Sequence, residues 1–138
     1  MSNQLKAFVG HSFTDNDSVV VDKFLKFFTT VTKMNIGFSW DHAEEAEAKE
    51  LAEKVKELIE DKNLFIGICT IKEAVINPTK LTQARFNKKM IKAEKVAFFS
   101  KTSDWIIQEI GLAIGRNMDI ILLLENGVRE PGGLQGNI

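Results

Sequence analysis

The sequence predicts one α/β domain, residues 1–138, built on an open, doubly wound parallel sheet flanked by helices. Short apolar runs alternate with longer segments of helical periodicity, which is the order that βα units produce. Several of these runs are nearly continuously apolar, as in strands buried on both faces. The expected strands lie at residues 5–9, 35–40, 64–69 and 119–125. With 138 residues, 44% of them hydrophobic, the chain is long enough to bury one core.

Two helices are expected between the first three strands. The segment 19–32 carries apolar residues at helical spacing, and Asp17 or Ser18 precedes it as a cap. Its expected buried face consists of Val20, Phe24, Phe27, Phe28 and Val31. The segment from Asp41 to about residue 61 predicts a long acidic helix. Its expected buried face consists of Ala48, Leu51, Ala52, Val55, Leu58 and Ile59.

The segment 70–101 is basic and lacks a clear apolar run. It holds eight basic and two acidic residues, and Asn77 and Pro78 mark a turn. The composition favours a solvated basic helix over a phosphate or partner site. The expected buried stripe of this helix is Phe86, Met90 and Ile91. Residues 96–99 either pack under the following helix or form a short strand.

The segment 103–117 predicts a helix with an ionisable residue beside its apolar stripe. Ser103 is suited to cap the helix, and Asp104 suits the positive end of the helix dipole. Asn117 is the expected stop. Ile106, Ile110, Ala113 and Ile114 recur at helical spacing and are expected to face the core. Trp105 and Glu109 lie four residues apart, so an aromatic ring and a carboxyl group share one face.

The strand at 119–125 is expected to be buried, and Asn126 and Gly127 turn the chain away from it. No helical segment follows that could cover this strand. An uncovered sheet would expose a large apolar patch. We therefore expect the chain to be a fragment of a longer protein, or another domain or partner to cover that face.

The composition excludes several classes of partner and site. A net charge of −1 and a pI near 6.1 give no reason to expect nucleic acid or an anionic membrane as a partner. No apolar run is long enough to span a membrane, and no signal peptide opens the sequence, so we expect a cytoplasmic protein. The single cysteine, Cys69, is expected to be a buried, inert thiol. Two histidines and one cysteine are too few ligands for a zinc site, so no metal is expected.

In open α/β sheets, ligands bind outside the carboxyl ends of the strands. Here the loops at that edge are residues 10–18, 39–46 and 70 onward. A response-regulator receiver is excluded because the third strand ends in Cys69 and Thr70, without a phosphoacceptor aspartate. The first strand is not followed by the Gly-rich turn of a dinucleotide-binding unit, and no Walker motif is present.

Two stretches resemble Toll/interleukin-1 receptor (TIR) domains. The opening Lys6-Ala-Phe-Val-Gly-His-Ser-Phe-Thr-Asp-Asn-Asp17 is similar to the first strand and acidic loop of that family. Ser103-x-Trp105-x-x-x-Glu109 is similar to the segment that carries the catalytic glutamate in the NAD-cleaving members. The resemblance implies a flavodoxin-like TIR fold and cleavage of the nicotinamide–ribose bond of NAD. The acidic stretch Asp41-His-Ala-Glu-Glu-Ala46 departs from the proline, basic or glycine residues of many relatives.

The resemblance implies a role for Glu109 as the catalytic carboxylate, with NAD as substrate and no separate cofactor. Such a group stabilises an oxocarbenium-like ribose by charge and by binding a hydroxyl. The candidate substrate-binding residues are His11, Ser12, Phe13, Trp40, Ser103 and Trp105. The aromatic residues could stack on flat rings, although core packing explains Phe13 and Trp40 equally well. The serines could donate to ribose or phosphate oxygens, while Ser103 also suits a cap and His11 a structural role.

In this interpretation the chain is the NAD-consuming effector of a bacterial defence or cell-death system. It would be activated by self-association through TIR–TIR contacts, with a sensor domain or partner protein outside this chain. Two alternatives stay open: a scaffold TIR domain without catalysis, and an enzyme like the nucleoside deoxyribosyltransferases, which also place a glutamate at a ribose carbon. Whether the product is ADP-ribose or a cyclic form stays open as well.

Overall fold

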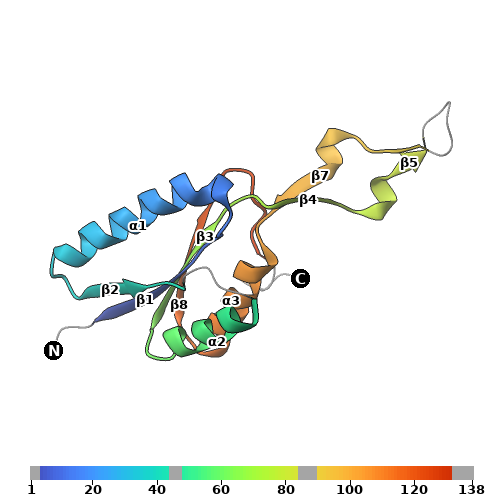
Figure 1. Ribbon diagram of the computed structural model, residues 1–138. Helices are drawn as coiled ribbons and strands as arrows, with labels where there is room; N and C mark the ends of the chain where they lie inside the picture. The colour runs from blue at the N-terminus through green and yellow to red at the C-terminus, as the bar shows by residue number, and fades with distance from the viewer. Residues whose placement is uncertain (1–3, 44–47, 84–89, 132–138) are drawn as a thin grey trace.

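The computed structural model of the chain describes residues 4–43, 48–83 and 90–131. At its centre is a four-stranded sheet in the order β2-β1-β3-β8, in which all neighbouring strands are parallel (Figure 1). The strands are β1 (Leu5–Gly10), β2 (Phe38–Asp41), β3 (Leu64–Cys69) and β8 (Asp119–Leu124). All four expected strands are confirmed.

Helices cover both faces of the sheet. On one face, α1 (Ser18–Lys33) packs Phe28 against Val9 and Ile66. On the other, α2 (Ala48–Ile59) and α3 (Asp104–Gly115) pack against Phe8 and Phe65. The sheet is therefore buried from both sides through its centre, and the predicted mixed α/β class with a parallel sheet flanked by helices is confirmed.

Several predicted boundaries and faces were wrong. The second helix does not begin at Asp41, because Asp41 is the last residue of β2 and pairs with Phe8 of β1. Residues 44–47 and the side chains of 48–51 lie outside the described part of the chain, while Val55 and Ile59 are buried as predicted. On α1, the expected buried residues Val20 and Phe27 are 45% and 60% exposed.

The predicted basic helix within 70–101 was wrong: the described part of the segment forms an antiparallel excursion, here called the arm (residues 71–83 and 90–101). Its strands β4 (Glu73–Ile76) and β7 (Phe98–Lys101) pair, as do β5 (Thr82–Gln83) and β6 (Ile91–Lys92). The short helices η2 (Pro78–Lys80) and η3 (Lys95–Ala97) join them. Figure 1 shows the arm projecting away from the carboxyl edge of the sheet.

β-Branched and aromatic residues at the root of the arm explain the strands. Val75 lies opposite Phe99, and Ile76 lies opposite Phe98, pairs that stabilise sheets. Met90 and Ile91 are exposed, so they form no buried stripe, and Phe86 lies outside the described residues. Of the two alternatives for residues 96–99, the short strand is the one observed, from Phe98 onward.

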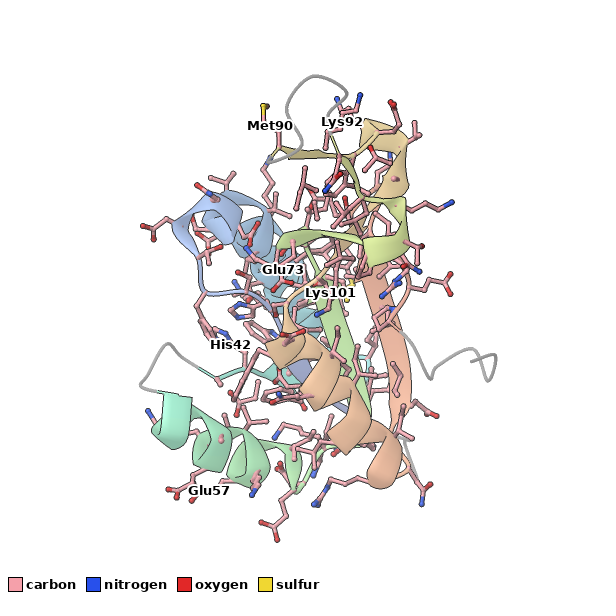
Figure 2. All side chains as sticks on the ribbon, turned by 90° about the vertical axis from the view of Figure 1, so that its right-hand side faces the viewer. His42, Glu57, Glu73, Met90, Lys92 and Lys101 are labelled. Atoms are coloured by element: carbon pink, nitrogen blue, oxygen red, sulfur yellow. The ribbon has the colours of Figure 1, made fainter. Side chains whose placement is uncertain are left out.

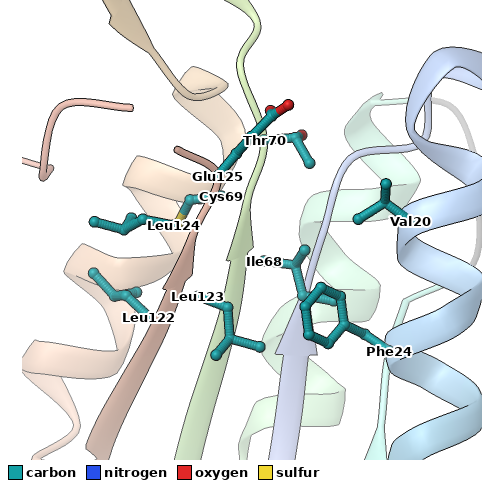
Figure 3. A pocket seen from close by; sticks show the side chains of 9 residues that line it. All are labelled: Val20, Phe24, Ile68, Cys69, Thr70, Leu122, Leu123, Leu124 and Glu125. Carbon is teal, nitrogen blue, oxygen red and sulfur yellow. The ribbon is translucent and has the colours of Figure 1, made fainter. Parts of the chain in front are cut away.

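The last strand is less buried than predicted. Among the described residues β8 pairs only with β3, and Ile121 and Leu124 are 47% and 36% exposed. An apolar groove of about 400 Å³ lies between α1 and β8, as Figure 3 shows. It is lined by Val20, Phe24, Ile68, Cys69, Thr70 and residues 122–125. The expected apolar patch is therefore present. No helix in the described ranges has the length and apolarity to cross a bilayer.

Candidate functional site

The candidate site is built around the first two turns of α3. The Ser103 hydroxyl accepts a hydrogen bond from the Ile106 N–H at 3.3 Å, which caps the helix as predicted. Lys101 pairs with Asp104 in the first turn. Ile106 and Ile110 are buried in the core, and this orientation of the helix brings Glu109 to the same buried side. Ile114, expected in the core, is 45% exposed because it lies on the outer side of the last turn.

Glu109 is 4% exposed, and its Oε1 has no hydrogen-bond partner within the described residues. The same oxygen lies against the end of β1, at 3.0 Å from the position that a Cβ on Gly10 would occupy. The Phe65 ring lies at 2.9 Å from that position. A buried, unpaired carboxyl oxygen costs free energy, so it is rarely kept without a function.

Burial raises the pKa of Glu109 from 4.5 to about 8. The cause is desolvation, which disfavours the charged carboxylate. In the free protein at neutral pH the carboxyl group is therefore mostly protonated. It can donate a proton, and it can also ionise when a cation approaches it.

The space in front of Glu109 is too narrow to admit water. It measures about 160 Å³, and no water-sized sphere fits inside it. Its lining comprises Phe8, Val9, Gly10, His11, Phe13, Ala43, Trp105 and Glu109. Pockets for drug-sized ligands measure about 300–1,000 Å³. A ligand the size of a nucleotide can therefore reach Glu109 only after part of this cover moves.

A second opening, which admits water-sized spheres, reaches Glu109 between α2 and α3. It has a volume of about 130 Å³ and is lined by α2 residues that include Lys56 and by Trp105, Gln108 and Glu109 of α3. Trp105 therefore lies between the two spaces and is half-buried. The predicted pairing of this ring with Glu109 is present.

Two histidines form a hydrogen-bonded pair beside this space. His11 Nε2 and His42 Nδ1 are 2.8 Å apart, and His11 Nδ1 lies 2.9 Å from the Ser12 carbonyl oxygen. Because that carbonyl only accepts, His11 Nδ1 carries a proton, and in the neutral pair His42 Nδ1 donates to His11 Nε2. Burial lowers the pKa of His11. No group of three His, Cys, Asp or Glu side chains in the described ranges is arranged to hold a metal.

The structure brings together only part of the predicted site. His11, Phe13, Trp105 and Glu109 line one space. Trp40 instead lies on the α1 face, where its ring centroid is 6.1 Å from that of Phe28, and it also lies 5.3 Å from the His42 ring.

The two serines predicted to bind substrate already have partners in the protein. The Ser103 hydroxyl is used as the helix cap. The Ser12 hydroxyl lies 3.0 Å from the Thr14 hydroxyl and accepts from the Thr14 N–H at 3.1 Å.

Sequence reasoning did not single out Gly10, His42 and Ala43, although all three lie in the loops that it placed at the ligand-binding edge. His42 and Ala43 directly follow β2, so their place at the carboxyl edge of the sheet was a usable signal. The need for glycine at position 10 had no such signal, because it arises from Glu109, 99 positions later in the chain.

A buried polar cluster also lies at the carboxyl edge and was not foreseen. The Asp17 carboxylate accepts from Thr14 at 2.9 Å, from Thr70 at 3.1 Å and from Lys72. It connects the loop after β1 to the root of the arm.

Comparisons with known proteins identify no relative of this chain. No family model, no curated protein and no solved structure matches the chain.

Proposed function

We propose that this chain is a TIR-like enzyme that cleaves the nicotinamide–ribose bond of NAD, with Glu109 as its catalytic residue. The observation that carries the proposal is the buried, unpaired carboxyl group of Glu109 between Gly10, Phe13 and Trp105. Strongly perturbed carboxyl groups at the carboxyl edge of an α/β sheet are candidates for function. The resemblance of residues 6–17 and 103–109 to NAD-cleaving TIR domains supports the substrate.

The reaction needs little help at the leaving group. The bond between ribose C1′ and the ring nitrogen breaks, and its electron pair goes to the cationic nicotinamide, which leaves neutral. Positive charge then develops on the ribose, and an adjacent carboxylate stabilises it. Water, or a hydroxyl of the substrate in a cyclisation, forms the new bond at C1′ and loses its proton.

The raised pKa of Glu109 fits a cationic substrate. An opposite charge within a few ångströms lowers a carboxyl pKa. The nicotinamide ring of NAD carries that charge, so its binding would favour the ionised Glu109 that the transition state requires. A neutral ligand would leave the carboxyl protonated.

The aromatic residues support binding of flat rings. Phe13 and Trp105 both line the space at Glu109 and are half-buried. If they move apart they widen the narrow space and expose two ring faces on which nicotinamide can stack. In this proposal Trp40 and Ser103 do not contact substrate, because one packs in the core and the other caps α3.

The proposal includes the setting in which such domains act. The chain would serve as the effector of a bacterial defence or cell-death system, with self-association opening the narrow site and a sensor domain or partner supplying the signal. The 160 Å³ space in front of Glu109 supports a requirement for activation.

The test is nicotinamide release from NAD, followed by chromatography at high protein concentration and with a crowding agent. Wild type is compared with Glu109→Gln and with Glu57→Gln, which changes an exposed carboxyl group on α2. We expect release by wild type and Glu57→Gln but not by Glu109→Gln. Release by Glu109→Gln at the wild-type rate, or none by the wild type when driven to associate, would sink the proposal. The product peak distinguishes ADP-ribose from a cyclic form.

A second candidate is an enzyme like the nucleoside deoxyribosyltransferases. The burial of Glu109 favours it, because burial raises the pKa of this carboxyl group and a neutral carboxyl can protonate the leaving base of an uncharged nucleoside. Base release from nucleosides but not from NAD would select this candidate. Failure with both substrates would favour the scaffold alternative.

A further inference from the structure

Charge is distributed unevenly along the chain. Residues 77–97 hold six basic residues and one acidic residue, which leaves 12 basic and 18 acidic residues elsewhere. This segment of the sequence therefore carries a charge of +5 and the rest of the chain −6, although the net charge of the whole is only −1.

The root of the arm is packed against the body of the protein. Val75 and Phe99 lie opposite each other across β4 and β7, and the Arg129 guanidinium lies 4.3 Å from the centroid of the Phe99 ring. The Arg129 N–H also donates to the Ser100 carbonyl at 2.8 Å. These contacts hold the root in place on the sheet domain.

The arm tip, defined as residues 77–83 and 90–97, lacks such packing. Ile91 lies opposite Gln83 in the β5–β6 pair and so has no apolar partner across the ribbon. The exposed fractions of the large aliphatic side chains are 40% for Leu81, 57% for Met90, 68% for Ile91 and 93% for Val96. Exposed apolar groups gathered at one place mark interaction sites.

Exposed lysines alternate with these aliphatic residues. Lys80 precedes Leu81, Lys92 follows Ile91, and Lys95 precedes Val96. All three lysines are exposed, and Glu94 is the one acidic residue of the tip. Aliphatic carbon and positive charge therefore adjoin each other at three places along the tip: at the end of η2, in β6 and in η3.

The tip lies at one end of the molecule. Figure 2 shows Met90 and Lys92 at the end of the arm and Glu57, on α2, at the opposite end. A negatively charged surface would attract the basic segment 77–97 and repel the net negative charge of the rest of the chain. The charge distribution therefore favours one orientation, with the tip toward the surface.

We propose that the arm tip binds the surface of an anionic lipid bilayer. The lysines pair with the anionic headgroups, and Met90, Ile91 and Val96 enter the boundary between headgroups and acyl chains. Lipid surfaces select this combination, since affinity rises with both buried apolar area and positive charge. Nucleic acid uses the charge but gives aliphatic side chains little to contact. The proposal is independent of any activity at Glu109.

The test is co-sedimentation with vesicles of phosphatidylcholine alone or mixed with phosphatidylserine. The protein should pellet with the mixed vesicles only. Each lysine near such a surface contributes about fivefold in affinity, so Lys80→Glu, Lys92→Glu and Lys95→Glu combined should weaken binding by at least about a hundredfold. Ile91→Ser with Val96→Ser should weaken the binding that persists at high salt.

Matched controls lie on the body. Lys23→Glu, Lys26→Glu and Lys54→Glu change the same charge at exposed helix positions, and Met34→Ser with Ile36→Ser removes apolar groups that are 60% and 66% exposed. These variants should bind as wild type does, and circular dichroism confirms that all variants fold. Equal loss in both sets, or no pelleting of wild type, would overturn the proposal. The proposal would also be overturned if the protein did not bind vesicles but bound duplex DNA, or formed an oligomer, in a way that the tip substitutions abolish.

Discussion

The Glu109 carboxyl oxygen Oε1 lies 3.0 Å from the point at which any residue other than glycine at position 10 would place its Cβ. The Phe65 ring limits the same space at 2.9 Å. A helix residue and a strand residue 99 positions apart therefore depend on each other. The absence of a side chain at position 10 lets the carboxyl group reach the carboxyl edge of the sheet.

Gly10→Ala tests this contact. The added methyl group would meet the Phe65 ring and the Glu109 carboxyl oxygen closer than normal packing allows, so the ring or the carboxyl group must shift. Overpacking of this kind costs about 1–3 kcal/mol of unfolding free energy, measured by urea denaturation. The control is Gly111→Ala, which meets nothing within 4 Å on α3 and should stabilise the helix by up to about 1 kcal/mol. Equal effects of the two changes would contradict the contact.

The raised pKa of Glu109 predicts a pH dependence of stability. The folded protein keeps this proton up to about pH 8, whereas the unfolded chain loses it near 4.5. Between these values the folded state binds more protons, so the unfolding free energy falls as the pH rises, by at most ~1.4 kcal/mol per pH unit.

Urea denaturation across that range measures the slope. Glu109→Gln should remove this component and be more stable than wild type above pH 8, because the buried charge is gone. Glu57→Gln, at an exposed site, should keep the wild-type slope. An unchanged slope in Glu109→Gln would contradict a buried, protonated carboxyl group.

Replacement of Asp17 is expected to lower the unfolding free energy more than replacement of its charged partner Lys72. Asp17 is bonded by Thr14, Thr70 and Lys72, so Asp17→Ala leaves three donors without their acceptor. We expect it to lower the unfolding free energy by about 3 kcal/mol. Lys72→Ala leaves Asp17 with both threonine hydroxyls and should cost about 1 kcal/mol. Thermal or urea unfolding of both variants and their double mutant checks the order; a larger cost for Lys72→Ala would reverse the interpretation.

Two variants of Ser103 distinguish a role as helix cap from a role in substrate binding. Ser103→Ala removes the acceptor for the Ile106 N–H and should cost about 1 kcal/mol. Ser103→Asp restores an acceptor and should recover both the stability and any NAD cleavage. If Ser103→Asp recovered stability without activity, the hydroxyl would have a direct role at the substrate.

Local patterns predicted most of the sheet domain. The continuous apolar run at 64–69 and the cap and periodicity of α3 depend on neighbours in the sequence, and both elements lie where the pattern placed them. The arm was missed because Val75 and Ile76 of β4 form a strand only through their pairing with Phe99 and Phe98 across the ribbon. A window of neighbouring residues does not contain that pairing.

The sequence by itself determined the alternation of strands and helices, the cap on α3 and the closeness of Trp105 to Glu109, because each arises from residues within one or two turns. Only the tertiary structure decided the rest of the site. It placed Trp40 on the opposite face, joined His11 to His42, and buried Glu109 against Gly10. Those outcomes depend on which strand ends meet at one edge and on how closely α3 packs there, and contacts between distant residues set both.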